Sequence, residues 1–174
     1  MRHKLTKDKL LKFMSELGSS VKSEGSCFFT GGATAVMHGW RETTIDVDLK
    51  LDPEPIGVFE SIAKLKETLN INVELASPDQ FIPVADDWRT GSAFIGKFGK
   101  ISFYHYDYVS QALSKLERGH EQDLRDVKLM LQHRMITKEA LRIGFQGVRA
   151  KLVRYPAIDA DQFEKKVEEF LKLV

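Results

Sequence analysis

The stretch FFTGGATAVMHGWRETTIDVDLKLD, residues 28–52, decides how this chain folds. An apolar segment ends in two glycines, a short run of mostly small residues follows, and a second apolar segment then carries two aspartates, Asp46 and Asp48. Short apolar runs bounded by glycines are typical of buried strands. We therefore predict three elements here: a strand at 26–30, a short helix at 33–40 closed by Gly39, and a second strand at 43–51.

The second strand alternates apolar and polar residues. Strand side chains point to opposite faces in turn, so one face should carry Ile45, Val47, Leu49 and Leu51 and the other Thr44, Asp46, Asp48 and Lys50. Two carboxylates on one strand face lie about 7 Å apart and repel each other unless something positive lies between them. Mg²⁺ takes oxygen ligands and commonly links carboxylates to substrate phosphates. The pattern therefore predicts a divalent cation at Asp46 and Asp48.

The glycine pair, Gly31 and Gly32, supplies a complementary feature. A strand that ends in two glycines and opens a helix presents backbone N–H groups at the positive end of the helix dipole. Glycine has no side chain to block the approach of a phosphate group. We therefore predict a phosphate site next to the cation site.

The rest of the chain predicts an α+β fold, in which a small mixed sheet is flanked by helices and followed by a helical C-terminal segment. Periodic apolar residues indicate a first helix from the N-cap Thr6 to near Gly25 and a second marked by Val58, Ile62, Leu65 and Leu69. Further strands are expected at 71–76 and 100–108. The last third should contain a stripe of Leu124, Val127 and Leu131, a helix at 137–150 and a terminal helix at 159–173.

Composition sets the frame for this fold. The chain has 174 residues, of which 43% are hydrophobic and 29% charged, so we expect one compact domain with a core at 1–110 and a helical segment at 111–174 packed on it. A net charge of +1 means that any binding of polyanions must come from a local patch. The single cysteine, Cys27, favours the cytoplasm, and we expect neither a signal peptide nor a membrane segment.

The order of these features resembles the polymerase-beta-like nucleotidyltransferase superfamily. That family carries a strand ending in a Gly-rich turn, a short helix and a strand with Asp-x-Asp, matched here by Gly31-Gly32 and Asp46-Val47-Asp48. GGATAVMHGWRETTIDVDL is most similar to the bacterial minimal nucleotidyltransferases related to abortive-infection and toxin–antitoxin systems, in which an Arg and a Thr precede the aspartates. The resemblance covers about residues 25–135. A second part of it lies in KLERGHEQDLRDVKLML, at Lys115, Arg118, Asp123 and Asp126, where ion pairs around a helix start are also expected.

The resemblance implies an activity and a set of site residues. A nucleoside monophosphate would pass from a nucleoside triphosphate to a hydroxyl acceptor with the help of Mg²⁺ or Mn²⁺, the acceptor being a tRNA end, a partner protein or a small molecule. The catalytic and metal-binding residues would be Asp46, Asp48 and Glu74, with Asp79 as the reserve for the third carboxylate. Glu74 shares its strand face with Asn72. The nucleotide-binding residues would be Gly31, Gly32, Thr34, Arg41 and Thr44.

Two departures from the family pattern lead to an alternative function. Gly32 stands where the commonest family form has a phosphate-binding Ser, and Glu74 stands where it has Asp. The alternative is a catalytically lapsed member of the fold that acts as an antitoxin or nucleotide-binding partner.

Two other polar features have interpretations of their own. The basic residues Arg134, Lys138 and Arg142 are expected on one helix face, either to hold phosphates or to lie in solvent. His38 is expected to be packed rather than to act as a base.

Overall fold

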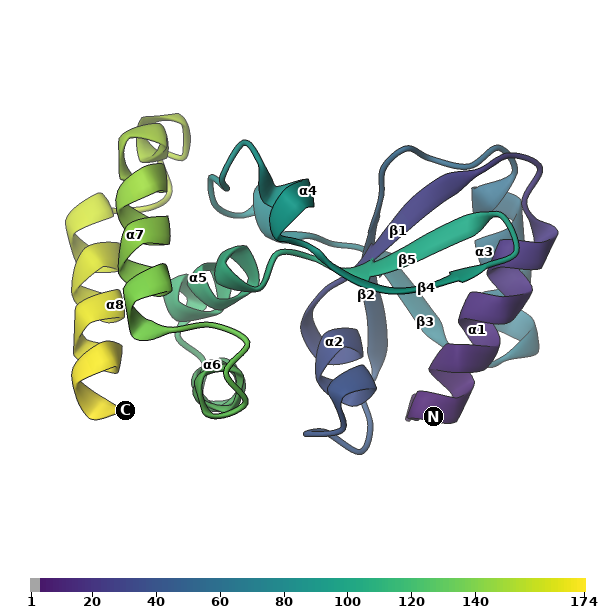
Figure 1. The fold of residues 1–174 in the computed structure, drawn as a ribbon, viewed down its shortest axis with the longest axis horizontal. Coiled ribbons are helices and arrows are strands. Elements are labelled where there is room, and N and C mark those ends of the chain that lie inside the picture. The colour runs from purple at the N-terminus through teal and green to yellow at the C-terminus, as the bar shows by residue number, and fades with distance from the viewer. Residues whose placement is uncertain (1–3) are drawn as a thin grey trace. The chain divides into compact units, whose positions relative to one another are not determined.

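The computed structural model describes residues 4–174, which form two compact units. The first contains the chain up to Ser77 together with Ser92–Tyr106, and the second contains Pro78–Gly91 together with Asp107–Val174. The first unit holds the sheet and the second is helical, so the predicted α+β class is confirmed (Figure 1).

The sheet of the first unit is mixed, in the strand order β3-β2-β1-β5-β4. Its strands are β1 (Gly25–Phe29), β2 (Asp46–Leu51), β3 (Asn72–Leu75), β4 (Ala93–Phe98) and β5 (Ile101–His105). β2 pairs antiparallel with β1 and parallel with β3. β5 pairs parallel with β1 and antiparallel with β4. Two segments far apart in sequence, around residues 46–51 and 72–75, thus become direct neighbours.

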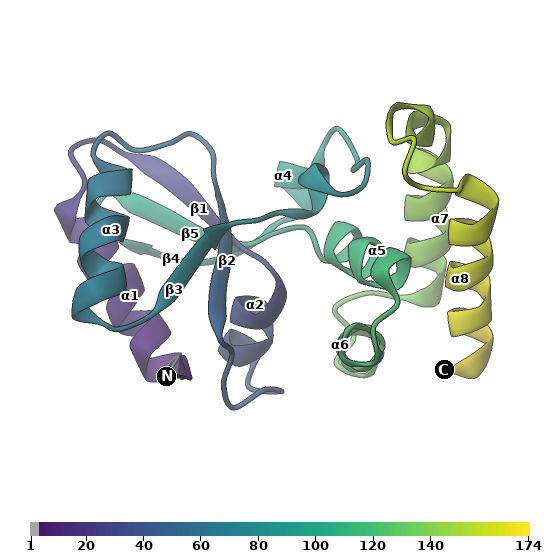
Figure 2. The same ribbon diagram turned by 180° about the vertical axis from the view of Figure 1, so that it is seen from behind.

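One face of this sheet forms the core with two helices, α1 (Lys7–Ser20) and α3 (Val58–Thr68). Figures 1 and 2 show these helices side by side next to the sheet. The predicted N-cap is confirmed, because the Thr6 side chain accepts a hydrogen bond from the Lys9 backbone. The helices contribute the apolar residues that the periodicity indicated: Leu10, Met14, Leu17, Ile62 and Leu65, which meet Cys27, Phe29, Val47, Leu49 and Phe103 of the sheet.

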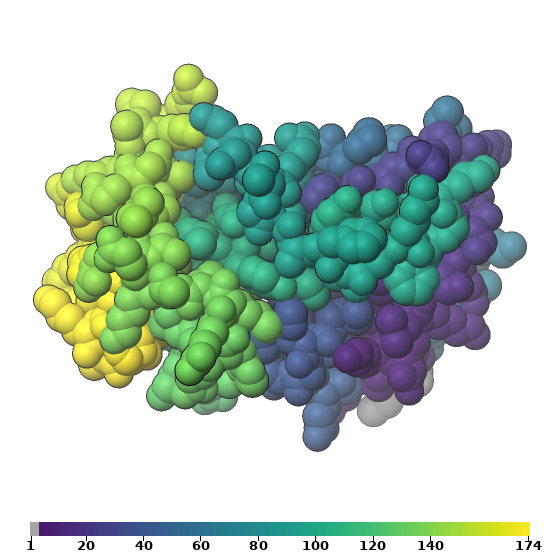
Figure 3. All heavy atoms as spheres, in the orientation of Figure 1, coloured from purple at the N-terminus to yellow at the C-terminus, as the bar shows by residue number. Residues whose placement is uncertain are grey.

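β4 was not expected from the sequence. Its segment AFIGKF contains Gly96, and the register with β5 shifts between Phe94 and Gly96, which breaks the alternation that marks a strand. Its end approaches α1 so closely that a Cβ at Gly18 would lie 1.8 Å from the Phe98 carbonyl oxygen. Figure 3 shows the β4–β5 hairpin, in teal, at the visible surface of the first unit.

The second unit consists of helices. They are η1 (Pro78–Gln80), α4 (Trp88–Gly91), α5 (Tyr108–Arg118), α6 (Glu121–Gln132), α7 (Lys138–Arg149), η2 (Ala150–Arg154) and α8 (Ala160–Leu173). α7 and α8 lie side by side in Figures 1 and 2. Phe145 of α7 and Phe163 of α8 meet edge to face with ring centroids 5.0 Å apart. None of the helices within residues 4–174 is both long enough and apolar enough to span a bilayer.

Two expectations about the first unit are wrong. α1 ends at Ser20, not near Gly25, because the Ser19 and Ser20 hydroxyls bond back to helix carbonyls and Val21 adopts an extended conformation. β2 begins at Asp46, so Ile45 lies outside the sheet and is 52% exposed instead of joining the core.

Two expectations about the second unit are also wrong. The buried face of α6 carries Asp126, Val127 and Met130, whereas Leu124 and Leu131 are only half-buried. Arg134 precedes α7 and has a φ of 57°, so it does not share a helix face with Lys138 and Arg142.

Candidate functional site

The two aspartates of β2 meet β3 in a fixed register. Asp46 is paired with Asn72, and Asp48 is paired with Glu74. Side chains at paired positions of neighbouring strands point to the same face of the sheet. The structure therefore brings Asp46, Asp48 and Glu74 together on one face.

The opposite face explains why these carboxylates point outward. Val47 and Leu49, which alternate with the aspartates, are fully buried in the core against α1 and α3. Asp46 and Asp48 are half-buried, and Glu74 is exposed. Burial of the apolar residues thus fixes the direction of the acids, as the alternation predicted.

An asparagine side chain joins two of the acids. Asn72 Nδ2 donates one hydrogen bond to Asp46 Oδ1, at 2.7 Å, and another to Glu74 Oε1, at 2.8 Å. A single polar group therefore lies between these two carboxylates and offsets their mutual repulsion.

The glycine pair lies directly against the aspartates. Gly31, the first residue of α2 (Gly31–His38), has a φ of 55°, in the left-handed region that favours glycine. A Cβ at Gly31 would lie 2.8 Å from Asp48 Oδ2, closer than such atoms normally approach. The Thr30 backbone N–H also donates to the Asp48 carbonyl oxygen at 3.0 Å. The start of α2 is therefore held beside the Asp48 carboxylate.

Thr44 and Arg41 lie around the second glycine. A Cβ at Gly32 would lie 2.1 Å from Thr44 Oγ1 and 3.4 Å from Arg41 Nη1. The backbone of Thr44 is fixed by two hydrogen bonds with Leu5, which is fully buried. A guanidinium group and the first turn of a helix thus lie together, and both favour an anion.

Two other predicted residues, Thr34 and Asp79, are engaged in contacts within their own units. Thr34 is fully buried, its Oγ1 donates to the Phe29 carbonyl oxygen at 3.2 Å, and the same atom is 3.1 Å from His105 Nδ1. The Thr34 hydroxyl therefore faces the interior of the first unit. Asp79, the reserve carboxylate, lies in η1 of the second unit, where its carbonyl oxygen accepts a hydrogen bond from the Tyr155 hydroxyl at 3.2 Å.

His38 lies in a stack of rings, as its expected packing role requires. Its ring centroid is 4.9 Å from that of Trp40 and 4.3 Å from that of His105. Burial, with a smaller effect of His38, lowers the pKa of His105 to about 3. His105 is therefore neutral at physiological pH. No local pattern in the sequence indicates its contact with Thr34, because the two residues lie on separate elements.

The donor set partly fits a divalent cation. Carboxylates of Asp46, Asp48 and Glu74 are oxygen donors of the kind that Mg²⁺ prefers. Within residues 4–174, however, no three His, Cys, Asp or Glu side chains are grouped so that they hold a metal ion by themselves. Mg²⁺ commonly binds through one or two carboxylates and is completed by substrate phosphates, and this arrangement fits the residues present.

The residues of the second similarity form a buried ion-pair network in the second unit. Lys115 Nζ lies 2.6 Å from Asp126 Oδ2 and 3.3 Å from Asp123 Oδ1. Arg118 donates two hydrogen bonds to Asp123. Burial alone would raise the pKa of Asp123, but Arg118 and Lys115 outweigh it and hold this pKa below its usual range. These contacts agree with the expected ion pairs.

Several of the basic residues between 134 and 154 are engaged within the second unit. Arg142 binds Glu168, Arg149 binds Asp161 and Glu164, and Lys151 binds Asp86. Lys138 donates to the carbonyl oxygens of Leu171 and Val174. These contacts favour the interpretation as a solvated, ion-paired surface.

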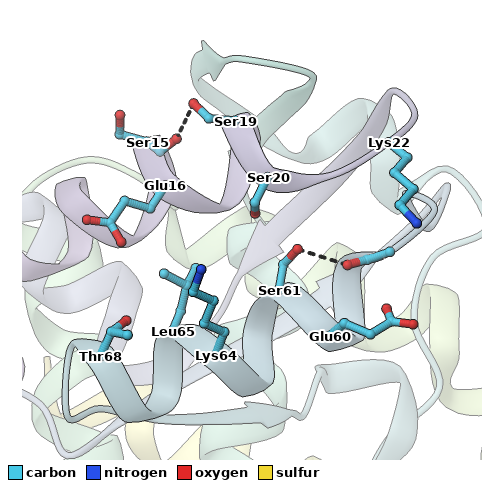
Figure 4. A pocket seen from close by; sticks show the side chains of 11 residues that line it. Ser15, Glu16, Ser19, Ser20, Lys22, Glu60, Ser61, Lys64, Leu65 and Thr68 are labelled. Carbon is cyan, nitrogen blue, oxygen red and sulfur yellow. Dashed lines mark hydrogen bonds between the residues drawn. The ribbon is translucent and has the colours of Figure 1, made fainter.

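A hollow of about 690 Å³ lies between α1 and α3, away from the acids of the sheet (Figure 4). Hydroxyl and charged side chains from both helices surround it. The Ser19 and Ser61 hydroxyls are bonded to the helix carbonyls of Ser15 and Gly57. None of the predicted site residues lines this hollow.

No protein-family model, curated protein or solved structure matches this chain. The functional argument therefore depends on the geometry of the site.

Proposed function

We propose that this protein is a Mg²⁺- or Mn²⁺-dependent nucleotidyltransferase that moves a nucleoside monophosphate from a nucleoside triphosphate to a hydroxyl acceptor. The observation that carries the proposal is the β2–β3 register, which pairs Asp48 with Glu74 beside the glycine that opens α2. Acid ligands for a cation and N–H donors for phosphate thus lie next to each other. A cytoplasmic location, where nucleoside triphosphates are available, accords with this function.

Each residue has a role in the proposed reaction. Asp46 and Asp48 hold the divalent cation, which, when bound, supplies charge stabilisation for the attacking and leaving oxygens of an in-line displacement. The N–H groups at Gly31 and Gly32, with the Arg41 guanidinium, bind the outer phosphates. The Thr34 hydroxyl takes no part, because it bonds inside the unit.

Bond changes in the reaction occur at the α-phosphate. The acceptor oxygen forms a bond to the α-phosphorus, the bond from that phosphorus to its bridging oxygen breaks, and pyrophosphate leaves. Glu74, an exposed carboxylate paired with Asp48, accepts the proton of the acceptor hydroxyl and would also help to hold the cation. The acceptor is a tRNA end, a partner protein or a small molecule.

The test is a transfer assay with each α-³²P-labelled nucleoside triphosphate, Mg²⁺ or Mn²⁺, and total cellular RNA or protein. We expect the wild type to label one acceptor class and Asp48→Asn to label none. Asp8→Asn is the matched control, because it makes the same change at an exposed residue of α1. Labelling that persists in Asp48→Asn, or no labelling with any triphosphate, would count against the proposal.

The second candidate is a lapsed enzyme that binds nucleotide as an antitoxin or partner module. Two observations favour it: the Asn72 amide already lies between Asp46 and Glu74, and the family's Ser is missing at its own position, where Gly32 has no hydroxyl. The Thr44 hydroxyl opposes it, because its oxygen lies 2.1 Å from where a Cβ at Gly32 would be. Equilibrium binding of labelled triphosphate separates the two candidates. Binding that is lost in Arg41→Ala, without any transfer by the wild type, would favour the partner module.

A further inference from the structure

The Asn72 side chain makes two hydrogen bonds to carboxylates, and neither bond is part of the strand ladder or of the apolar core. Its side chain is on the polar face of β3, and one nitrogen atom bonds to carboxylates on two different strands. An asparagine amide nitrogen carries two hydrogens, so it can donate to both oxygens at once. The Asn72 amide therefore offsets the repulsion between the Asp46 and Glu74 carboxylates, as a bound cation would.

A divalent cation needs the same carboxylate oxygens. The oxygen atoms that accept from Asn72 are Asp46 Oδ1 and Glu74 Oε1, and both carboxylates belong to the proposed metal site. A cation that takes Asp46 Oδ1 and Glu74 Oε1 competes with the N–H groups that point at these two oxygens. The cation therefore gains these two oxygen ligands only when the amide gives up its two hydrogen bonds.

We propose that the Asn72 side chain is an internal competitor of the divalent cation, which holds Asp46 and Glu74 in the cation-free protein and sets the affinity of the site. This inference rests on the proposed function, because it assumes that the site takes a cation. Asn72 is a positioning residue in this scheme: it acts through the two carboxylates and touches neither nucleotide nor acceptor.

The proposal gives the direction of two substitutions. Asn72→Ala removes the N–H donors, and Asn72→Asp replaces them with oxygen acceptors in a side chain of nearly the same shape. In both variants the cation no longer has to break two hydrogen bonds to charged groups. We expect the Kd for Mn²⁺ to fall by roughly tenfold or more, because one such bond is worth about that factor. A purely structural role for Asn72 would instead weaken or preserve Mn²⁺ binding in Asn72→Ala, which is the deciding variant because Asn72→Asp also adds a negative charge to the site.

The wild type offers a test that needs no substitution. Asn70 and Asn72 are the only asparagines in the chain, so asparagine-selective ¹⁵N labelling gives two pairs of side-chain amide signals. Asn70 is exposed at the end of α3 and serves as the internal control. On titration with Mg²⁺, which is diamagnetic, the Asn72 pair should shift while the Asn70 pair stays in place. An unmoved Asn72 pair at Mg²⁺ concentrations that calorimetry shows to saturate the protein would overturn the proposal.

Calorimetric titration of Mn²⁺ into the wild type and both variants separates this proposal from the proposed function. If the wild type binds Mn²⁺ and the variants do not bind it more tightly, the role of Asn72 is refuted and the metal site stands. If only the variants bind Mn²⁺, the role of Asn72 is supported and the wild type is not a metal-dependent enzyme. If none of the three proteins binds Mn²⁺, both proposals fail.

Discussion

Lys115 gives a prediction whose magnitude follows from its burial. The side chain is almost completely buried, and its nitrogen lies 2.6 Å from Asp126, which is 1% exposed. Lys115→Ala would leave the Asp126 carboxylate buried with Gln122 as a remaining donor, at 3.2 Å. Removal of one partner of a buried ion pair costs about 3–5 kcal/mol, because the other charge stays in a medium that solvates it poorly.

This cost should appear as a large shift of the melting temperature. For a chain of this size, 1 kcal/mol corresponds to about 2–4 °C, so we expect Lys115→Ala to melt about 6–20 °C lower than the wild type. Arg142→Ala is the matched control, because it removes an ion pair with Glu168 in the same unit whose side chains are 43% and 40% exposed. Exposed pairs contribute at most about 1 kcal/mol.

Circular dichroism on heating measures both variants. The double variant Lys115→Met/Asp126→Leu also removes the Asp126 charge and should recover part of the lost stability, since the buried Asp123 keeps its two hydrogen bonds from Arg118. Equal melting temperatures for Lys115→Ala and Arg142→Ala would refute the reasoning. So would a double variant as unstable as Lys115→Ala alone.

Two other predictions concern pH and helix packing. In the folded protein the pKa of His105 is about 3, so below about pH 6.5 its imidazole takes up a proton in the unfolded chain but not in the folded one. The free energy of unfolding should therefore fall by up to about 1.4 kcal/mol per pH unit as pH drops below about 6.5. Urea unfolding between pH 7 and pH 5 checks this, and an equal slope in His105→Leu would contradict it. In α7, Gly144→Ala should destabilise by about 1–3 kcal/mol, because its Cβ would lie 2.4 Å from Val109 Cγ1. Gly147→Ala, whose Cβ would meet no atom within 4 Å, should stabilise the protein by about 1 kcal/mol. Melting temperatures of Gly144→Ala and Gly147→Ala that shift in the same direction would count against this packing.

Features that depend on local sequence could be predicted. Thr6 was predicted to cap its helix and does so, because a short polar side chain can reach the free N–H groups of the first turn. The last two long helices were predicted at 137–150 and 159–173, close to their observed ranges. The direction of Asp46 and Asp48 follows from alternation with two buried apolar residues. These predictions needed no knowledge of which element packs against which.

Features that depend on pairing between distant segments could not be predicted. The sequence placed Asn72 and Glu74 on one face of a strand, but the alignment of that strand with Asp46 depends on tertiary packing. The face of α6 was misjudged because Lys115 of α5 draws Asp126 into the interior, where hydrophobic periodicity predicts an apolar residue. Thr34 could not be assigned for a related reason, since its partner His105 comes from another strand.

The central claim is that Asp46 and Asp48 hold a divalent cation. Calorimetric titration of Mn²⁺ into the wild type, the double variant Asp46→Asn/Asp48→Asn and the control Asp8→Asn tests it most directly. The Asn substitutions keep the side-chain shape and remove the charges on the face that pairs with β3. We predict that the wild type and Asp8→Asn bind Mn²⁺ equally well and that the double variant does not bind it. Indistinguishable binding by the wild type and the double variant would contradict the account.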